Sequence, residues 1–160
     1  MVFWPHQRFL YWEIPVSLQE WLVNGWLRAH KTTRQEIREL LAIADRDVEN
    51  CSVAGLSADW QLAIAYNAAL QLATAALAAA GYRAERDSHH YRVIQSLVLT
   101  VGMDARRAAQ LDGFRKKRNV SDYERAHAIS QQEAEEMKRL ARDLRAQVEV
   151  WLRANHPDLV

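Results

Sequence analysis

The stretch from Trp60 to Ala80, WQLAIAYNAALQLATAALAAA, contains no charged residue and is rich in alanine. Ser57 can cap a helix at its start, and Gly81 can end that helix in a left-handed conformation. The sequence therefore predicts one long helix over 57–80, and the rest of the fold must be arranged around it.

A helix without charges either spans a membrane or lies at the centre of a bundle. Polar residues recur through this one, and its alanines give it a low hydropathy for a span: Gln61, Asn67, Gln71, Thr74. We therefore predict a buried central helix and no membrane contact. Among its side chains, Trp60, Ile64 and Leu77 are expected to be mostly buried.

Capping residues followed by apolar side chains at helical spacing predict the remaining helices. Ser17, Thr33 and Ser130 each precede a glutamate by three residues, which is the capping-box pattern. Ser88 and Asp104 can start two further helices. The predicted ranges are about 17–30, 33–52, 88–101, 105–119, and 130 to near Pro157.

No segment alternates like a strand, and only 5 glycines and 3 prolines are available for turns. The predicted fold is all-α, a bundle of five to six mostly antiparallel helices joined by short connections. Residues 17–156 form one predicted helical domain. The aromatic segment 1–16 precedes it as an N-terminal extension, which is either an arm that binds a partner or an irregular terminus.

Composition limits the function classes. The net charge is +1 and the pI about 8.0, so any attraction to nucleic acid must come from a local patch. The single Cys51 excludes an intrachain disulfide and a cysteine zinc cluster. Because residues 1–16 also lack a signal-peptide pattern, a cytoplasmic location is expected. No glycine-rich phosphate loop or metal-binding helix motif is present, so no cofactor or metal is predicted.

The strongest local patch is the stretch LDGFRKKRNVSDYE, residues 111–124. On a helix, Arg115, Arg118 with Asn119, and Asp122 would share one face. Arginine presents a planar fork of donors to phosphate oxygens, and neighbouring lysines add attraction to a polyanion. We therefore take four residues as candidate nucleic-acid contacts: Arg115, Lys116, Lys117, Arg118. The alternative is a basic helix end that offsets the helix dipole.

A second polar stretch, GYRAERDSHHYR, covers residues 81–92. Its His89 and His90 stand at a predicted helix start. Histidine titrates near neutral pH, so one of them is a candidate acid–base group. The alternative is that both serve in capping and hydrogen bonding between helices.

Together, these segments resemble a known family. The alanine-rich AYNAALQLATAAL, followed by GYR, HHYR and LDGFRKKRN, is similar to the HEPN domain over roughly residues 33–155. HEPN domains are helical bundles, typically homodimeric, and many are metal-independent ribonucleases of toxin–antitoxin or defence systems. Many are encoded with a small nucleotidyltransferase that acts as the antitoxin.

The family motif is an arginine, a polar residue, a short spacer and a histidine. By this resemblance Arg118 matches the arginine and Asn119 the polar residue, while Tyr123 stands where the histidine is expected. These three are the catalytic residues that the resemblance implies. A tyrosine of ordinary pKa near 10 is ionised to only about one part in a thousand at pH 7, so Tyr123 is a poor base.

The sequence therefore predicts a HEPN-like protein that binds RNA or a nucleotide, with metal-independent RNA cleavage as its candidate activity. Because tyrosine replaces the motif histidine, a second interpretation stays open. It is a non-catalytic interaction module that partners a nucleotidyltransferase or another protein.

Overall fold

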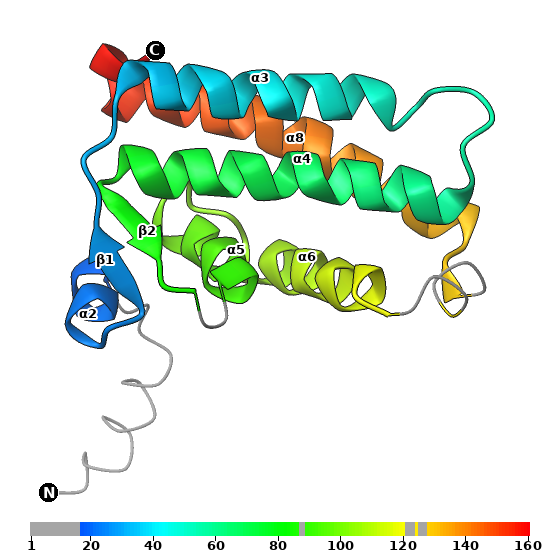
Figure 1. Cartoon of the computed structure of the whole chain (residues 1–160), viewed down its shortest axis with the longest axis horizontal. Coiled ribbons are helices and arrows are strands. Elements are labelled where there is room, and N and C mark those ends of the chain that lie inside the picture. The colour runs from blue at the N-terminus through cyan, green and yellow to red at the C-terminus, as the bar shows by residue number, and fades with distance from the viewer. Residues whose placement is uncertain (1–16, 87–88, 121–123, 125–127) are drawn as a thin grey trace, which may run out of the picture.

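A computed structural model of the chain describes residues 17–86, 89–120, 124 and 128–160. Within these residues, six α-helices, two short strands and a terminal 3-10 turn follow one another (Figure 1). Their bounds, in chain order, are α2 Leu18–Val23, β1 Leu27–Ala29, α3 Arg34–Asn50, α4 Ala58–Ala79, β2 Tyr82–Ala84, α5 His89–Leu99, α6 Ala105–Arg118, α8 Gln131–Asn155 and η1 Pro157–Leu159.

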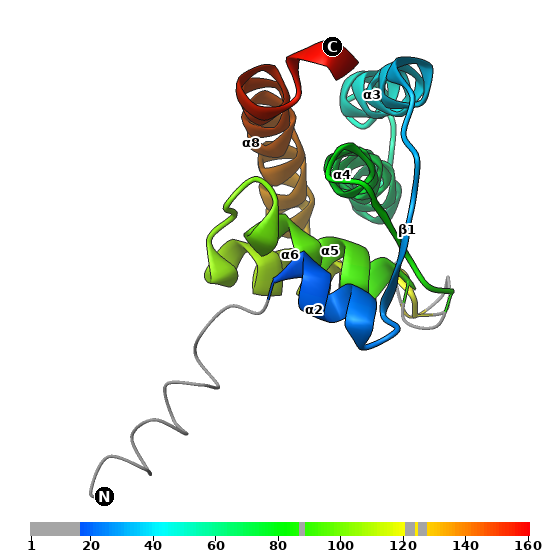
Figure 2. The ribbon, with the colours of Figure 1, turned by 90° about the vertical axis from the view of Figure 1, so that its left-hand side faces the viewer.

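The helices form two layers. Figure 2 shows the long helices α3, α4 and α8 side by side above the shorter α2, α5 and α6. Helix α3 runs antiparallel to α4, and α8 runs in the same direction as α4 because α5 and α6 intervene in the chain (Figure 1). The predicted all-α bundle is confirmed, and its helices share one hydrophobic core.

Helix α4 lies at the centre of that core, as predicted. Its Leu62, Ala65, Ala69, Leu72 and Ala76 side chains are fully buried. Alanine at so many positions lets α3 and α8 approach the α4 backbone closely. By length and composition alone α4 would pass as a membrane span, but 72% of its most apolar 18-residue stretch is buried inside the protein. This burial places α4 in the core of the bundle.

One part of the α4 prediction is wrong: Trp60 is 54% exposed. Leu77 is buried as expected, whereas Ile64 is only partly buried. Trp60 and Ile64 start a stripe that continues through Asn67, Gln71 and Thr74, none of which is fully buried. This stripe contains no charged residue, so the charge pattern did not indicate its partial exposure. The polar residues that recur along it did indicate that this side of α4 is partly exposed.

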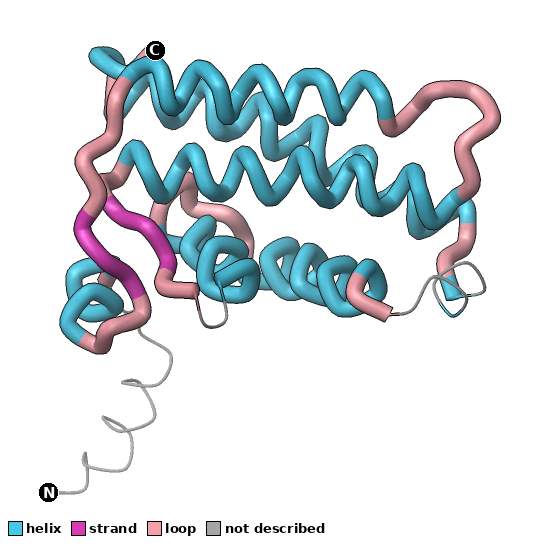
Figure 3. The backbone as a smooth tube through the Cα atoms, viewed as in Figure 1, coloured by secondary structure: helices cyan, strands magenta, loops and turns pink. Residues whose placement is uncertain are grey.

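The first predicted helix, 17–30, is also wrong in extent. Helix α2 ends at Val23, and Asn24 with Gly25 stops it, Gly25 having a φ of 78° that favours glycine. The chain then forms β1, which pairs antiparallel with β2 in a two-stranded sheet (Figure 3). The expectation of no strand is corrected accordingly. This short sheet fastens the N-terminal segment to the end of α4.

The capping predictions explain where the helices begin. The hydroxyls of Ser17 and Thr33 each accept a hydrogen bond from the backbone N–H three residues on, both at 3.1 Å. Ser130 forms a full reciprocal capping box with Glu133. Ser57 lacks this bond and instead donates its hydroxyl to Asp59. Asp104 caps α6 through the N–H of Arg106.

Candidate functional site

An open groove of about 430 Å³ lies where the start of α5 meets the end of α6. Two sequence segments that were predicted separately line it. The connection before α5 and its first turn contribute Arg86, His89, His90 and Tyr91, and α6 contributes Arg115 with its C-cap Asn119. The groove therefore combines arginine, histidine and tyrosine side chains with the amide of an asparagine.

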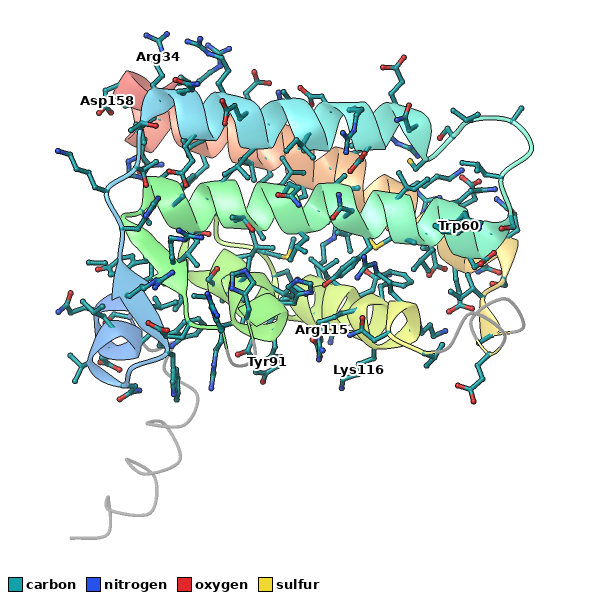
Figure 4. The ribbon with its side chains drawn as sticks, in the orientation of Figure 1. Arg34, Trp60, Tyr91, Arg115, Lys116 and Asp158 are labelled. Carbon is teal, nitrogen blue, oxygen red and sulfur yellow. The ribbon has the colours of Figure 1, made fainter. Side chains whose placement is uncertain are left out.

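Arg115 is held in place at the edge of this groove. Its Nε donates to Asp112 at 2.7 Å, one helical turn earlier, and both side chains are largely buried. Its guanidinium carbon also lies 5.8 Å from the ring centroid of Tyr91. Figure 4 shows Tyr91 and Arg115 beside each other along α5 and α6. Arg115 bonds to Asp112 through Nε, and the planar guanidinium carries further N–H donors of the kind that suit an anion.

The two lysines of the basic run behave differently. Lys116 is mostly exposed and lies 3.6 Å from Asp112. Lys117 pairs with Glu133 and so joins α6 to α8. Both lie in the last turn of α6, where cations offset the negative end of the helix dipole. Neither lysine lines the groove. Both lysines fit the interpretation of a basic helix end, whereas Arg115, in the same last turn and paired with Asp112, also lines the groove.

Arg118 lies over a side chain that sequence reasoning missed. Its guanidinium carbon is 5.3 Å from the ring centroid of Tyr66, which is fully buried on α4. The Tyr66 hydroxyl is buried and has no hydrogen-bond partner among the described residues. Burial raises the pKa of Tyr66 to about 12, even though Arg118 and Arg115 lower it. Tyr66 is therefore a neutral donor beneath the basic end of α6.

His90 contacts the same buried tyrosine. Its ring centroid lies 6.5 Å from that of Tyr66 and 5.6 Å from that of His89. Burial lowers the pKa of His90 below its ordinary 6.5, and the neighbouring His89, Arg118 and Arg115 side chains lower it further. His90 is therefore neutral at pH 7 and can accept a proton or a hydrogen bond.

Cation–π contacts of Arg92 join α5 to the N-terminal part of the described chain. The Arg92 guanidinium carbon lies 3.7 Å from the ring centroid of Trp26 and 5.4 Å from that of Tyr91. The nitrogen of Gln95 donates to the Tyr91 hydroxyl at 2.8 Å. Cation–π contacts at these distances orient the Tyr91 ring at the groove wall. Arg86 and Tyr91 lie within the polar segment quoted from the sequence, but neither was singled out there.

Some predicted residues lie outside the described part of the chain. Tyr123 and Asp122 are among them, so the motif role of Tyr123 beside Arg118 and Asn119 stays a prediction. Asn119 is described and lines the groove. Within the described residues, no three His, Cys, Asp or Glu side chains cluster closely enough to hold a metal ion.

A second cavity of about 190 Å³ lies between α3, α8 and the end of the chain. Ile37 and Leu152 form an apolar floor, and Arg34, Arg38 and Arg153 contribute to its lining. Arg34 and Asp158 mark this end of the molecule in Figure 4. No predicted site residue falls there.

Comparison with known proteins finds no matching family model, no similar curated protein and no similar solved structure. The resemblance to the HEPN family therefore rests on the sequence segments quoted above, and family membership stays a prediction.

Proposed function

We propose that this protein is a HEPN-type RNA-binding protein that cleaves RNA without a metal ion, in the setting of a toxin–antitoxin or defence system. The observation that carries the proposal is the groove in which His89 and His90 of α5 face Arg115 and Asn119 of α6. Two polar segments that are separate in sequence converge on one site, which a purely solvated helix end would not require.

The chemistry of the lining suits a nucleotide. The guanidinium of Arg115 matches the oxygens of a phosphodiester, and Asn119 can donate to and accept from a base or sugar. Tyr91 offers an aromatic face, which is the usual platform for an unpaired base. A groove of about 430 Å³ falls in the size range of small-ligand sites, about 300–1,000 Å³. These features favour single-stranded RNA over a duplex.

Binding is tested by fluorescence anisotropy with a short labelled single-stranded RNA, comparing wild type with Arg115→Ala. Loss of a charge-assisted hydrogen bond should weaken binding by about 1.5–3 kcal/mol, or roughly 10-fold to 150-fold. Arg107→Ala is the matched control, because Arg107 lies on the same helix and pairs with Asp143 at 3.1 Å, outside the groove. Equal affinity of all three proteins for RNA would refute the proposed site.

The partners are part of the same proposal. A homodimer with the two Arg118 regions near its two-fold axis is the assembly expected of this family, since an isologous contact places the same patch on both sides. A nucleotidyltransferase is the expected antitoxin. Light scattering at tens of micromolar tests the dimer, and a monomer at that concentration would count against it.

A non-catalytic interaction module is the second candidate function. The observation in its favour is that Asp112 and Glu133 already pair with Arg115, Lys116 and Lys117, so part of the basic run is neutralised within the chain. Tyr123, in place of the motif histidine, also favours a non-catalytic protein, because tyrosine is a poor base at pH 7. Absence of RNA binding together with stable binding to a nucleotidyltransferase would favour this candidate.

A further inference from the structure

We propose that His90 of α5 is the catalytic base of the groove and removes the proton from the RNA 2′-hydroxyl. The inference rests on the proposed function, and it deepens it by assigning the proton transfer to a residue outside the Arg118–Asn119–Tyr123 motif.

Position is the first argument. His90 lines the groove together with Arg115 and Asn119, the two groups best suited to hold a phosphodiester. A base must come within hydrogen-bond reach of the proton that it removes, directly or through one water. Arg115 and His90 line the same groove of about 430 Å³, so a phosphate bound by Arg115 would place its ribose in the space that His90 also lines.

The support beneath His90 is the second argument. The ring packs on Tyr66 of α4, whose side chain is fully buried and therefore fixed. The groups that act on it come from three helices: Tyr66 from α4, His89 from α5, and Arg115 and Arg118 from α6. A catalytic group held by packing in this way loses little freedom when substrate binds.

Charge state is the third argument. Burial keeps the pKa of His90 below 6.5, and the neighbouring His89, Arg118 and Arg115 side chains lower it further. The ring is therefore unprotonated at pH 7 and ready to accept a proton. Tyr123, at ordinary pKa, would offer about one ionised molecule in a thousand at that pH.

The reaction is an internal transesterification. The neutral His90 ring takes the 2′-hydroxyl proton while the 2′-oxygen attacks the phosphorus, and the bond from phosphorus to the 5′-oxygen breaks. The 5′-oxygen leaves with a proton taken from water, and the His90 imidazolium returns its proton to solvent. The products are a 2′,3′-cyclic phosphate and a 5′-hydroxyl, with no change in oxidation state.

The test compares wild type with His90→Gln, using a labelled single-stranded RNA and the same strand carrying one 2′-deoxy position, in buffer with chelator. Wild type should cleave the RNA to a cyclic-phosphate end and spare the 2′-deoxy linkage. His90→Gln should bind RNA within about twofold of wild type while cleavage falls about 100-fold or more, the contribution of a general base. The matched control is His156→Gln, since His156 packs on Trp151 outside the groove.

The dependence of the cleavage rate on pH distinguishes a catalytic base from a residue that only supports the structure, because loss of a structural residue would leave the shape of that dependence unchanged. The wild-type cleavage rate should rise with pH through a midpoint below 6.5 and then level off, and this rising limb should be missing from any residual activity of His90→Gln. Circular dichroism and thermal melting check that both proteins are folded, with His90→Asn as a second variant if His90→Gln is not.

The outcomes separate the two proposals. Full cleavage by a folded His90 variant would overturn the role of His90 and leave the proposed function intact. RNA binding without cleavage by wild type would overturn both the role of His90 and the cleavage part of the proposed function, leaving RNA binding alone. No RNA binding by wild type would overturn the proposed function itself.

Discussion

The guanidinium of Arg118 lies over the ring of Tyr66, with its central carbon 5.3 Å from the ring centroid. This contact joins the basic end of α6 to the buried centre of α4. It places a positive charge above a phenol whose hydroxyl has no hydrogen-bond partner among the described residues. The α6 end therefore contacts the core through the aromatic face of Tyr66, while Arg115 and Asn119 of the same helix end line the groove.

The Tyr66 hydroxyl gives the first prediction. A buried hydroxyl without a partner costs about 1–3 kcal/mol of desolvation, and Tyr66→Phe removes that group while keeping the ring. We expect the free energy of unfolding in urea to rise by about 1 kcal/mol.

Tyr82→Phe is the control, because the Tyr82 hydroxyl is bonded to Gln19 at 3.4 Å in an exposed position. That change should have an effect of less than about 0.5 kcal/mol. A loss of stability in Tyr66→Phe would mean that the hydroxyl has a partner.

His90 gives a prediction on pH. Its pKa in the folded protein is lowered below 6.5, so the unfolded chain binds the proton more tightly. As the pH falls from 6.5 toward the folded pKa, the unfolded state gains protons first, and the free energy of unfolding decreases. His90→Gln should lose less stability than wild type between pH 7 and pH 5.

Urea denaturation at several pH values measures this difference, and above pH 6.5 the two proteins should have parallel profiles. Identical pH dependence of wild type and His90→Gln across the acid range would show that the folded environment does not disfavour the charged ring.

Sequence patterns predicted most of the fold because its signals are local. Thr33 and Ser130 cap helices where expected, and the charge-free α4 lies in the core. The errors in secondary structure come from short local signals that the prediction overlooked. Asn24 and Gly25 are a helix stop that the longer predicted helix ran through, and the strands that follow are too short to alternate visibly.

The candidate site was predictable as two segments but not as one groove. His90 and Arg115 were both named from residue type, yet nothing local in the sequence says that α5 and α6 bring them together. Tyr66 was missed for a related reason. Its neighbours in sequence are apolar, and its proximity to Arg118 and His90 arises only from the packing of α4 on the lower layer.

The two sides of α4 give a third prediction. Leu72 is fully buried, so Leu72→Ala should cost about 2–5 kcal/mol by leaving a cavity. Trp60 is 54% exposed, and Trp60→Gln should change the free energy of unfolding by about 1 kcal/mol or less. Urea denaturation of both variants measures the contrast, which would reverse if Trp60 were the buried side of the helix.

The last prediction separates the cations of the basic run by salt dependence. Each phosphate neutralised on a single strand contributes about 0.7 to the slope of log binding constant against log salt concentration. Arg115→Ala should reduce that slope by about this amount, because Arg115 lines the groove. Lys117→Ala should leave the slope unchanged and instead lower stability by about 0.2–1 kcal/mol, since Lys117 pairs with Glu133 across α6 and α8. Anisotropy titrations of one RNA at four or more salt concentrations give both slopes, and urea denaturation gives the stability. Equal slope changes in the two variants would mean that the run attracts RNA through its total charge, and Arg115 would then have no special place in the groove.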